Sequence, residues 1–63
     1  MTYKIHHNSL GYAVSVHSSS GWIEYWLEER RNIVKHYKSY TNAVAAIHRH
    51  AKRFNISEVT ING

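Results

Sequence analysis

The sequence predicts a small α+β domain, in which an antiparallel β-sheet carries one helix packed on one face. Three segments rich in β-branched and aromatic residues follow one another at the start of the chain, separated by the turn sequences "NSL" and "SSSG". A later alanine-rich segment repeats apolar residues at helical spacing. Because 63 residues suffice for one core, we expect a single domain spanning residues 1–63.

The first three strands are expected at "TYKIHH", "GYAVSVH" and "WIEYWLE", joined as a meander. If "NSLG" closes the first hairpin, Ile5 lies opposite Val14. If "SSSG" closes the second hairpin, Val14 faces Tyr25 and Val16 faces Ile23. Both turns therefore select the same inner face. That face comprises Tyr3, Ile5, Tyr12, Val14, Val16, Ile23, Tyr25 and Leu27, and the outer face comprises Lys4, His6, Ala13, Ser15, His17, Trp22, Glu24 and Trp26.

The second half of the chain is expected to add one helix and two further strands. "EERRN" reads as a charged turn, and "IVKHYK" as a fourth strand of open register, because Lys35 separates the apolar Ile33 and Tyr37. "SYTNAVAAIHRHAKRFN" is typical of a helix with Thr41 as N-cap and Asn55 as stop, and "SEVTING" of a short final strand. The apolar helix stripe is Ala43, Val44, Ile47, Ala51 and Phe54, and the outer stripe is His48, Arg49, Lys52 and Arg53.

Composition favours an anionic partner. Eight Lys and Arg residues against four Asp and Glu give a formal charge of +4, which suits nucleic acid or an acidic protein surface. The absence of cysteine excludes disulfides, thiolate zinc sites and iron–sulfur clusters. The first residues lack the apolar run of a secretory signal, and no segment reaches membrane-spanning length. We therefore expect a cytoplasmic protein with no membrane partner.

Six histidines raise the question of catalysis or metal binding. His6 and His7 point to opposite faces of a strand, and His48 and His50 diverge on a helix. His6 and His17 share a face but lie two rows apart in the predicted register. Without cysteine, aspartate, a Gly-x-Ser-x-Gly elbow or a glycine-rich phosphate loop, nucleophilic and phosphoryl-transfer chemistry have no recognisable site. We expect a non-enzymatic protein with no metal and no cofactor.

The predicted binding surface combines aromatic and basic residues. Because the helix covers the inner face, Trp22 and Trp26 are left on the outer face, and tryptophan is enriched at binding hot spots. Basic residues of the helix and of the segment before it supply phosphate contacts, and the aromatic rings supply stacking surfaces for bases. The predicted site residues are Trp22, Trp26, Lys4, His6, His17, Arg30, Arg31, Lys35, Lys38, Arg49, Lys52 and Arg53.

"GYAV" in the second strand and Tyr40, Thr41, Ala43 and Ala46 at the helix start resemble small sheet-plus-helix DNA-binding modules. Such modules occur at the N-termini of tyrosine integrases and in plant ethylene-response factors. The resemblance implies that the exposed sheet face reads DNA. The chain departs from those families at Glu24, which places an anion on that face, and in having a strand after the helix. It is therefore assigned to neither family.

Two alternatives remain open. One is an inhibitor of the kind encoded by phages and mobile elements, which blocks a host enzyme or nuclease complex through protein–protein contact centred on the Trp22/Trp26 face. The other is a homodimer that buries both tryptophans through the same face. A nucleic-acid binder is separated from both by the steep salt dependence of its affinity.

Overall fold

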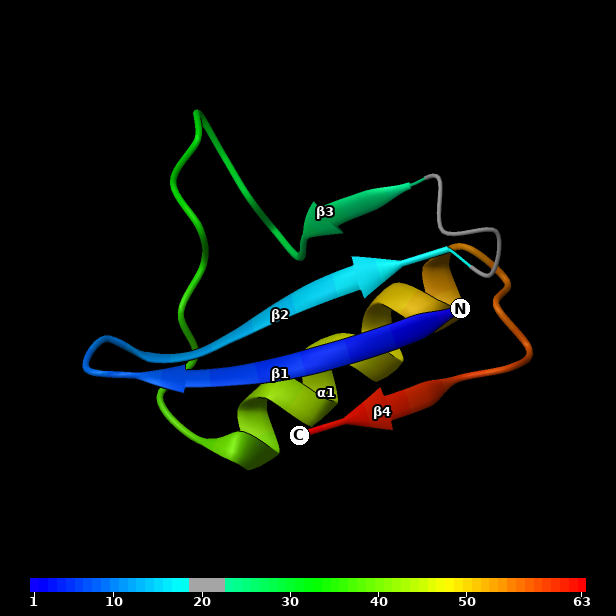
Figure 1. Ribbon diagram of the computed structural model, residues 1–63. Coiled ribbons are helices and arrows are strands. Elements are labelled where there is room, and N and C mark those ends of the chain that lie inside the picture. Colours follow the sequence, from blue (N-terminus) through cyan, green and yellow to red (C-terminus); the bar gives the residue numbers. More distant parts are fainter. Residues whose placement is uncertain (19–22) are drawn as a thin grey trace.

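The computed structural model describes residues 1–18 and 23–63, and it confirms the α+β class. Four strands form one sheet in the order β3-β2-β1-β4, and the helix packs across one face (Figure 1). The elements are β1 (Thr2–Asn8), β2 (Gly11–His17), β3 (Glu24–Trp26), α1 (Tyr40–Arg53) and β4 (Thr60–Asn62). Within the described ranges, no helix has the length and apolar character needed to cross a bilayer.

The first hairpin has the predicted register, with Ile5 opposite Val14. Its turn forms because the Asn8 side-chain oxygen accepts a hydrogen bond from the Leu10 amide at 2.8 Å. Gly11 then adopts a φ of +124°, and a Cβ at this position would lie 2.5 Å from the carbonyl oxygen of Tyr37. Glycine is therefore required there, both for the backbone conformation and for the close approach of the segment around Tyr37.

The second hairpin differs from the predicted register by two residues. Val16 lies opposite Tyr25 instead of Ile23, because the hairpin closes on Ser18 and Ile23, whose backbone N–H and C=O are joined at 2.9 Å. An even shift keeps every side chain on its predicted face. It leaves Ile23 just before the start of β3, however, where it is 56% exposed rather than part of the core. β3 ends at Trp26, shortly before Glu28 takes the left-handed φ of 57°.

The predicted fourth strand at 33–38 is not formed. Arg31 and Asn32 have positive φ values and make a tight turn, in which Arg30 and Ile33 exchange backbone hydrogen bonds. Only Tyr37 joins the sheet, through a single antiparallel bridge to Tyr12. The expected C-terminal strand is present as β4 and runs parallel to β1, so the sheet is mixed. Parallel neighbours need a long crossover connection, and α1 lies within it.

The helix begins two residues earlier than predicted. Ser39, not Thr41, is the N-cap, and its hydroxyl oxygen accepts from the Asn42 amide at 3.1 Å. Asn55 stops the helix as expected, with a φ of 54°. Phe54 was expected in the core but is 58% exposed, because it caps the helix end with a non-helical backbone. The helix residues that are buried are Ala43, Ala46, Ile47 and Ala51.

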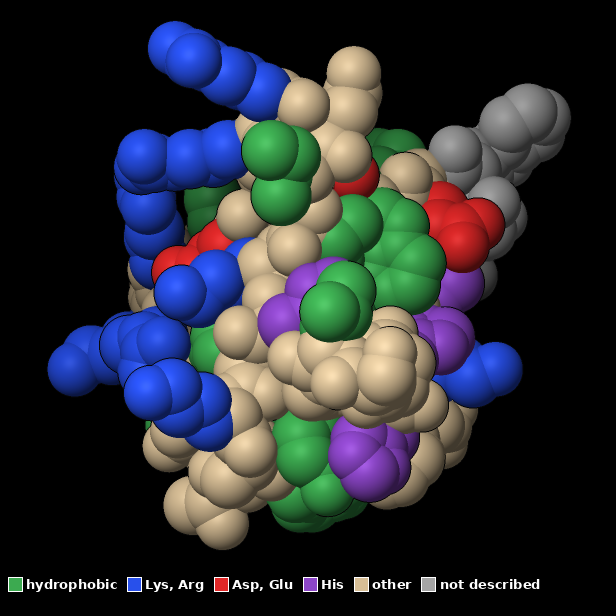
Figure 2. Space-filling model, turned by 90° about the vertical axis from the view of Figure 1, so that its left-hand side faces the viewer, with side chains coloured by type: hydrophobic (Ala, Val, Ile, Leu, Met, Phe, Trp, Pro, Cys, Tyr) green, Lys and Arg blue, Asp and Glu red, His purple; other side chains and the backbone are tan. Residues whose placement is uncertain are grey.

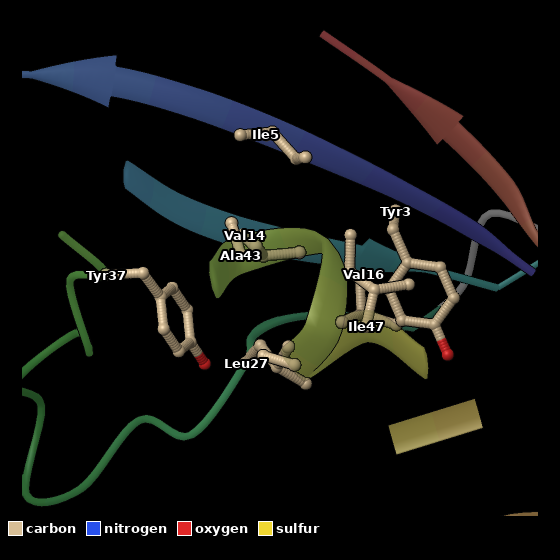
Figure 3. Packing of buried hydrophobic residues seen from close by; sticks show 9 residues of the cluster. Tyr3, Ile5, Val14, Val16, Leu27, Tyr37, Ala43 and Ile47 are labelled. Atoms are coloured by element: carbon tan, nitrogen blue, oxygen red, sulfur yellow. The ribbon is translucent and has the colours of Figure 1, made fainter. Parts of the chain in front are cut away.

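The core lies between the inner sheet face and α1 (Figure 3). Tyr3, Val14, Val16 and Ile47 are its largest fully buried side chains. Alanines on the facing side of the helix allow α1 to lie close to the sheet, where the larger side chains fill the space between them. Leu27 and Tyr37 close the core from the segment that connects β3 to α1.

Candidate nucleic-acid interface

The basic residues gather on the helix side of the molecule. Seven of the eight Lys and Arg residues lie on α1 or on the segment 27–39 that precedes it, and Lys4 alone lies on the outer sheet face. In Figure 2, lysine and arginine side chains gather along the left of the view, and histidine side chains are visible nearer its centre and right. We call the helix-side group the basic surface; it comprises Arg30, Arg31, Lys35, Lys38, Arg49, Lys52 and Arg53.

A groove of about 600 Å³ adjoins this surface, between β3 with the following turn and the C-terminal half of α1. Arg49 and Arg53 lie on its helical wall, and a smaller hollow of about 330 Å³ continues beside it past Arg49 and Lys35. Two of the predicted helix cations thus line a concave site. The groove is lined by Tyr25, Trp26, Leu27, Glu28, Glu29, Ala46, Arg49, His50, Arg53 and Phe54.

Three rings stand in a row along the groove, from Tyr25 through His50 to Phe54. The Tyr25 and His50 ring centroids are 5.9 Å apart, and those of His50 and Phe54 are 4.8 Å apart, both pairs tilted. The guanidinium carbon of Arg53 lies 5.6 Å from the centroid of the Phe54 ring, at the range of a cation–π contact. We call these three rings the aromatic row.

His50 anchors this row to the core. Its Nδ1 lies 2.8 Å from the hydroxyl of Tyr3, and its Nε2 lies 2.8 Å from the hydroxyl of Tyr25. A neutral imidazole has one donor and one acceptor nitrogen, so one tyrosine donates and the other accepts. Burial and the nearby Arg53 lower the pKa of His50, which keeps it neutral. Burial raises the pKa of both tyrosines, so the two hydroxyls also keep their protons.

The two carboxylates of the groove have different surroundings. Glu28 accepts a hydrogen bond of 2.6 Å from the hydroxyl of Tyr37, whose pKa is raised by burial and by this bond. Its left-handed backbone is a conformation that glutamate rarely adopts. Glu29 is exposed, and among the described residues no hydrogen bond or ion pair holds its side chain. One carboxylate is therefore fixed by the core, and the other faces solvent at the groove.

The outer sheet face carries the predicted residues Lys4, His6, His17 and Trp26, of which Trp26 also lines the groove. Ser15 is 3% exposed, and its hydroxyl lies 2.9 Å from Nε2 of His6 and 3.0 Å from Nε2 of His17. The ring of Trp26 packs on His6 with centroids 5.0 Å apart. Burial, with Lys4 and His17 nearby, lowers the pKa of His6. Both imidazoles of this face thus lie within hydrogen-bonding distance of the same hydroxyl.

The two histidines of this face lie closer together than their strand positions suggested, because both reach the same hydroxyl. Glu24 is 4.0 Å from Nδ1 of His17, the nitrogen that points away from Ser15. These groups therefore do not converge on one point. Among residues 1–18 and 23–63, no three His, Asp or Glu side chains are placed to hold a metal ion.

The predicted site is therefore divided by the sheet. Arg49, Arg53 and Lys35 come together at the groove and the adjoining hollow, whereas Lys4, His6 and His17 belong to the opposite face. Trp26 packs on His6 and also lines the groove. Trp22 lies outside the described residues.

Sequence reasoning missed the aromatic row. Tyr25 and Phe54 were assigned to the core, and His50 was considered only as a metal ligand. The spacing of His50 and Phe54, four residues apart at the end of a basic helix, is the signal that pairs them on one helix face.

Comparisons with protein-family models, curated proteins and solved structures found no match to this chain. The geometry of the groove and the charge around it are accordingly the basis for assigning a function.

Proposed function

We propose that this protein is a non-enzymatic nucleic-acid-binding module, and that the basic surface of α1 and the segment 27–39 contacts the phosphate backbone. The observation that carries this proposal is the separation of charge in the chain. Residues 27–53 hold seven basic and two acidic side chains, a charge of +5, whereas the rest hold one basic and two acidic, a charge of −1. The two add to the formal +4.

This distribution favours a polyanion over a single small anion. Arginine and lysine side chains spread over a helix and a neighbouring loop contact several phosphates at once, and each contact releases condensed counterions. Arg49 lies three residues before Lys52 and four before Arg53, so the three side chains share one exposed stripe of the helix. They can therefore contact successive phosphates of a backbone that runs along the helix. The open groove beside these residues can receive bases of the same strand.

The outer sheet face supports binding less well than the sequence alone indicated. Its one lysine, Lys4, is offset by Glu24, and Trp26 is only partly exposed because it packs on His6. A protein inhibitor or a homodimer centred on Trp26 would need that face to be open and unsatisfied. Seven of the eight cations, with the exposed rings of Tyr25 and Phe54, lie on the helix side instead.

The proposal is tested by fluorescence anisotropy with labelled single-stranded and duplex oligonucleotides between about 50 and 200 mM salt. We expect affinity to fall steeply as salt rises. Changing Arg49, Lys52 and Arg53 together to Gln should weaken binding about tenfold or more and reduce the salt slope by about 2, since each phosphate contact on a single strand contributes about 0.7. The matched control is Lys4→Gln, which removes one cation from the opposite face.

Two results would reject the proposal. One is the absence of measurable binding to any oligonucleotide at the lowest salt. The other is a triple Gln variant that binds with the same affinity and the same salt slope as the original protein, which would move the contacts away from the basic surface.

A further inference from the structure

We propose that the groove between β3 and α1 receives one unpaired nucleobase, stacked against the aromatic row of Tyr25, His50 and Phe54, so that the protein prefers single strands over duplexes. This inference rests on the proposed nucleic-acid binding and adds what enters the groove. In a duplex both faces of a base are covered by its neighbours, so only an unpaired base can offer its face to a protein ring.

The size of the groove fits a flat heterocycle. Its volume of about 600 Å³ falls within the range of roughly 300–1,000 Å³ that small-molecule sites occupy. Its walls supply rings from two elements, Tyr25 from β3 and His50 and Phe54 from the end of α1. A planar ligand can therefore contact aromatic surface contributed by both the sheet and the helix.

The aromatic row is held in place before any ligand arrives. Tyr3 is fully buried beside Val16 and Ile47 in the core (Figure 3). Its hydroxyl fixes His50 through a hydrogen bond of 2.8 Å. His50 in turn fixes the hydroxyl of Tyr25 at 2.8 Å. A stacking surface whose side chains are already immobilised loses little conformational entropy on binding. The hydrogen-bond chain from the core to the groove therefore prepares Tyr25 for contact with a ligand.

Phe54 gives the row its open end. Phe54 is the only phenylalanine of the chain, and its side chain is 58% exposed. It is the C-cap residue of α1, and it lines the groove instead of packing in the core. A large apolar ring in water is a favourable partner for a base, because stacking covers it. Arg53, 5.6 Å from the ring, lies on the same helical turn and is placed to contact a phosphate beside the stacked base.

Charge decides which part of a nucleotide occupies the groove. Glu28 and Glu29 line the groove and repel phosphate. A neutral base, in contrast, carries N–H groups that can donate hydrogen bonds to a carboxylate. Arg49 and Arg53 on the helical wall attract the flanking phosphates. The base is therefore expected inside the groove and the backbone along the helix.

The test compares two ligands of equal charge, hexathymidylate and a hexamer in which every base is removed and the sugar–phosphate backbone is kept. We expect the removal of the bases to weaken binding at least about fivefold, the lower end of the stacking contribution of one base. A duplex of the same length should also bind more weakly than the single strand. In Phe54→Ala, the difference between the two hexamers should shrink or disappear.

Ile33→Ala is the matched control, because Ile33 is an exposed apolar side chain of the basic surface region that does not line the groove. It should keep the full preference for the hexamer with bases. Equal affinity of the two hexamers, with a steep salt slope for both, would overturn the inference and leave the phosphate contacts standing. A preference for bases that persists unchanged in Phe54→Ala would also overturn it. Absence of binding to either hexamer would reject the proposed function as well.

Discussion

The outer sheet face and the helix-side groove both contain histidine beside an aromatic ring, but the two regions use these residues differently. On the sheet face, His6 and His17 bind the buried hydroxyl of Ser15, and Trp26 packs on His6. On the helix side, His50 holds the hydroxyl of Tyr25 by a hydrogen bond, and the rings of the aromatic row line a groove that also contains Arg49 and Arg53. Aromatic content alone does not distinguish a binding surface from a packed one; exposure and surrounding charge do.

The largest expected effect concerns the core layer that separates these two regions. Ile47→Ala should lower the free energy of unfolding by about 2–5 kcal/mol, because Ile47 is fully buried and its truncation leaves a cavity. The same change at Ile23, which is mostly exposed, should stay within about 0.5 kcal/mol. Denaturant unfolding of both variants checks the pair. Equal losses would show that Ile23 belongs to the core and that the observed register of β3 is wrong.

A smaller effect is expected on the sheet face. Ser15→Ala removes the hydroxyl that both histidines contact, and should lower the free energy of unfolding by about 0.5–1.5 kcal/mol, the usual net contribution of a hydrogen bond. Affinity for single-stranded oligonucleotides should be unchanged, because the groove lies on the other side of the sheet. A large loss of affinity in a variant that remains folded would make this face part of the binding surface.

The smallest effect is a loss of stability in acid. The pKa values of His6 and His50 are lowered in the folded protein, mainly by burial. In acid, these two histidines therefore bind more protons in the unfolded chain than in the folded chain. Stability contributed by these two groups is complete above their unfolded pKa of about 6.5 and is lost as pH falls below it. Thermal midpoints should therefore decrease from about pH 7 to about pH 5. His50→Gln should make this decrease shallower, and a variant with an unchanged pH profile would contradict the assignment.

The fold class and the faces of the strands were predictable because both depend on alternation along short segments. The "NSLG" turn gave the correct pairing of Ile5 with Val14, since Asn8 and Gly11 supply the local geometry. The second hairpin was displaced by two residues because its closing pair, Ser18 and Ile23, is not marked by any residue type. The even displacement preserved the faces but not the exposure of Ile23.

The proposed binding surface was predictable only in part. The helical spacing of Arg49, Lys52 and Arg53 correctly indicated an exposed basic stripe. The prediction of a fourth strand was wrong because Arg31 and Asn32 adopt left-handed backbone conformations that turn the chain back on itself. Such conformations are rare for arginine, so the sequence did not indicate the turn. The aromatic row was missed because hydrophobic periodicity treats every large apolar residue as core, whereas Phe54 lies at a helix end.

The most direct test of the difference between the two regions is the affinity of a matched pair of variants for hexathymidylate. Phe54→Ala removes the open ring of the groove, and His6→Leu removes a ring of the sheet face that does not line the groove while keeping an apolar side chain against Trp26. Circular dichroism first confirms that both variants are folded. If the groove binds a base, Phe54→Ala weakens binding about fivefold or more and His6→Leu leaves it within about twofold. Loss of binding in His6→Leu with full affinity in Phe54→Ala would contradict a base-binding groove.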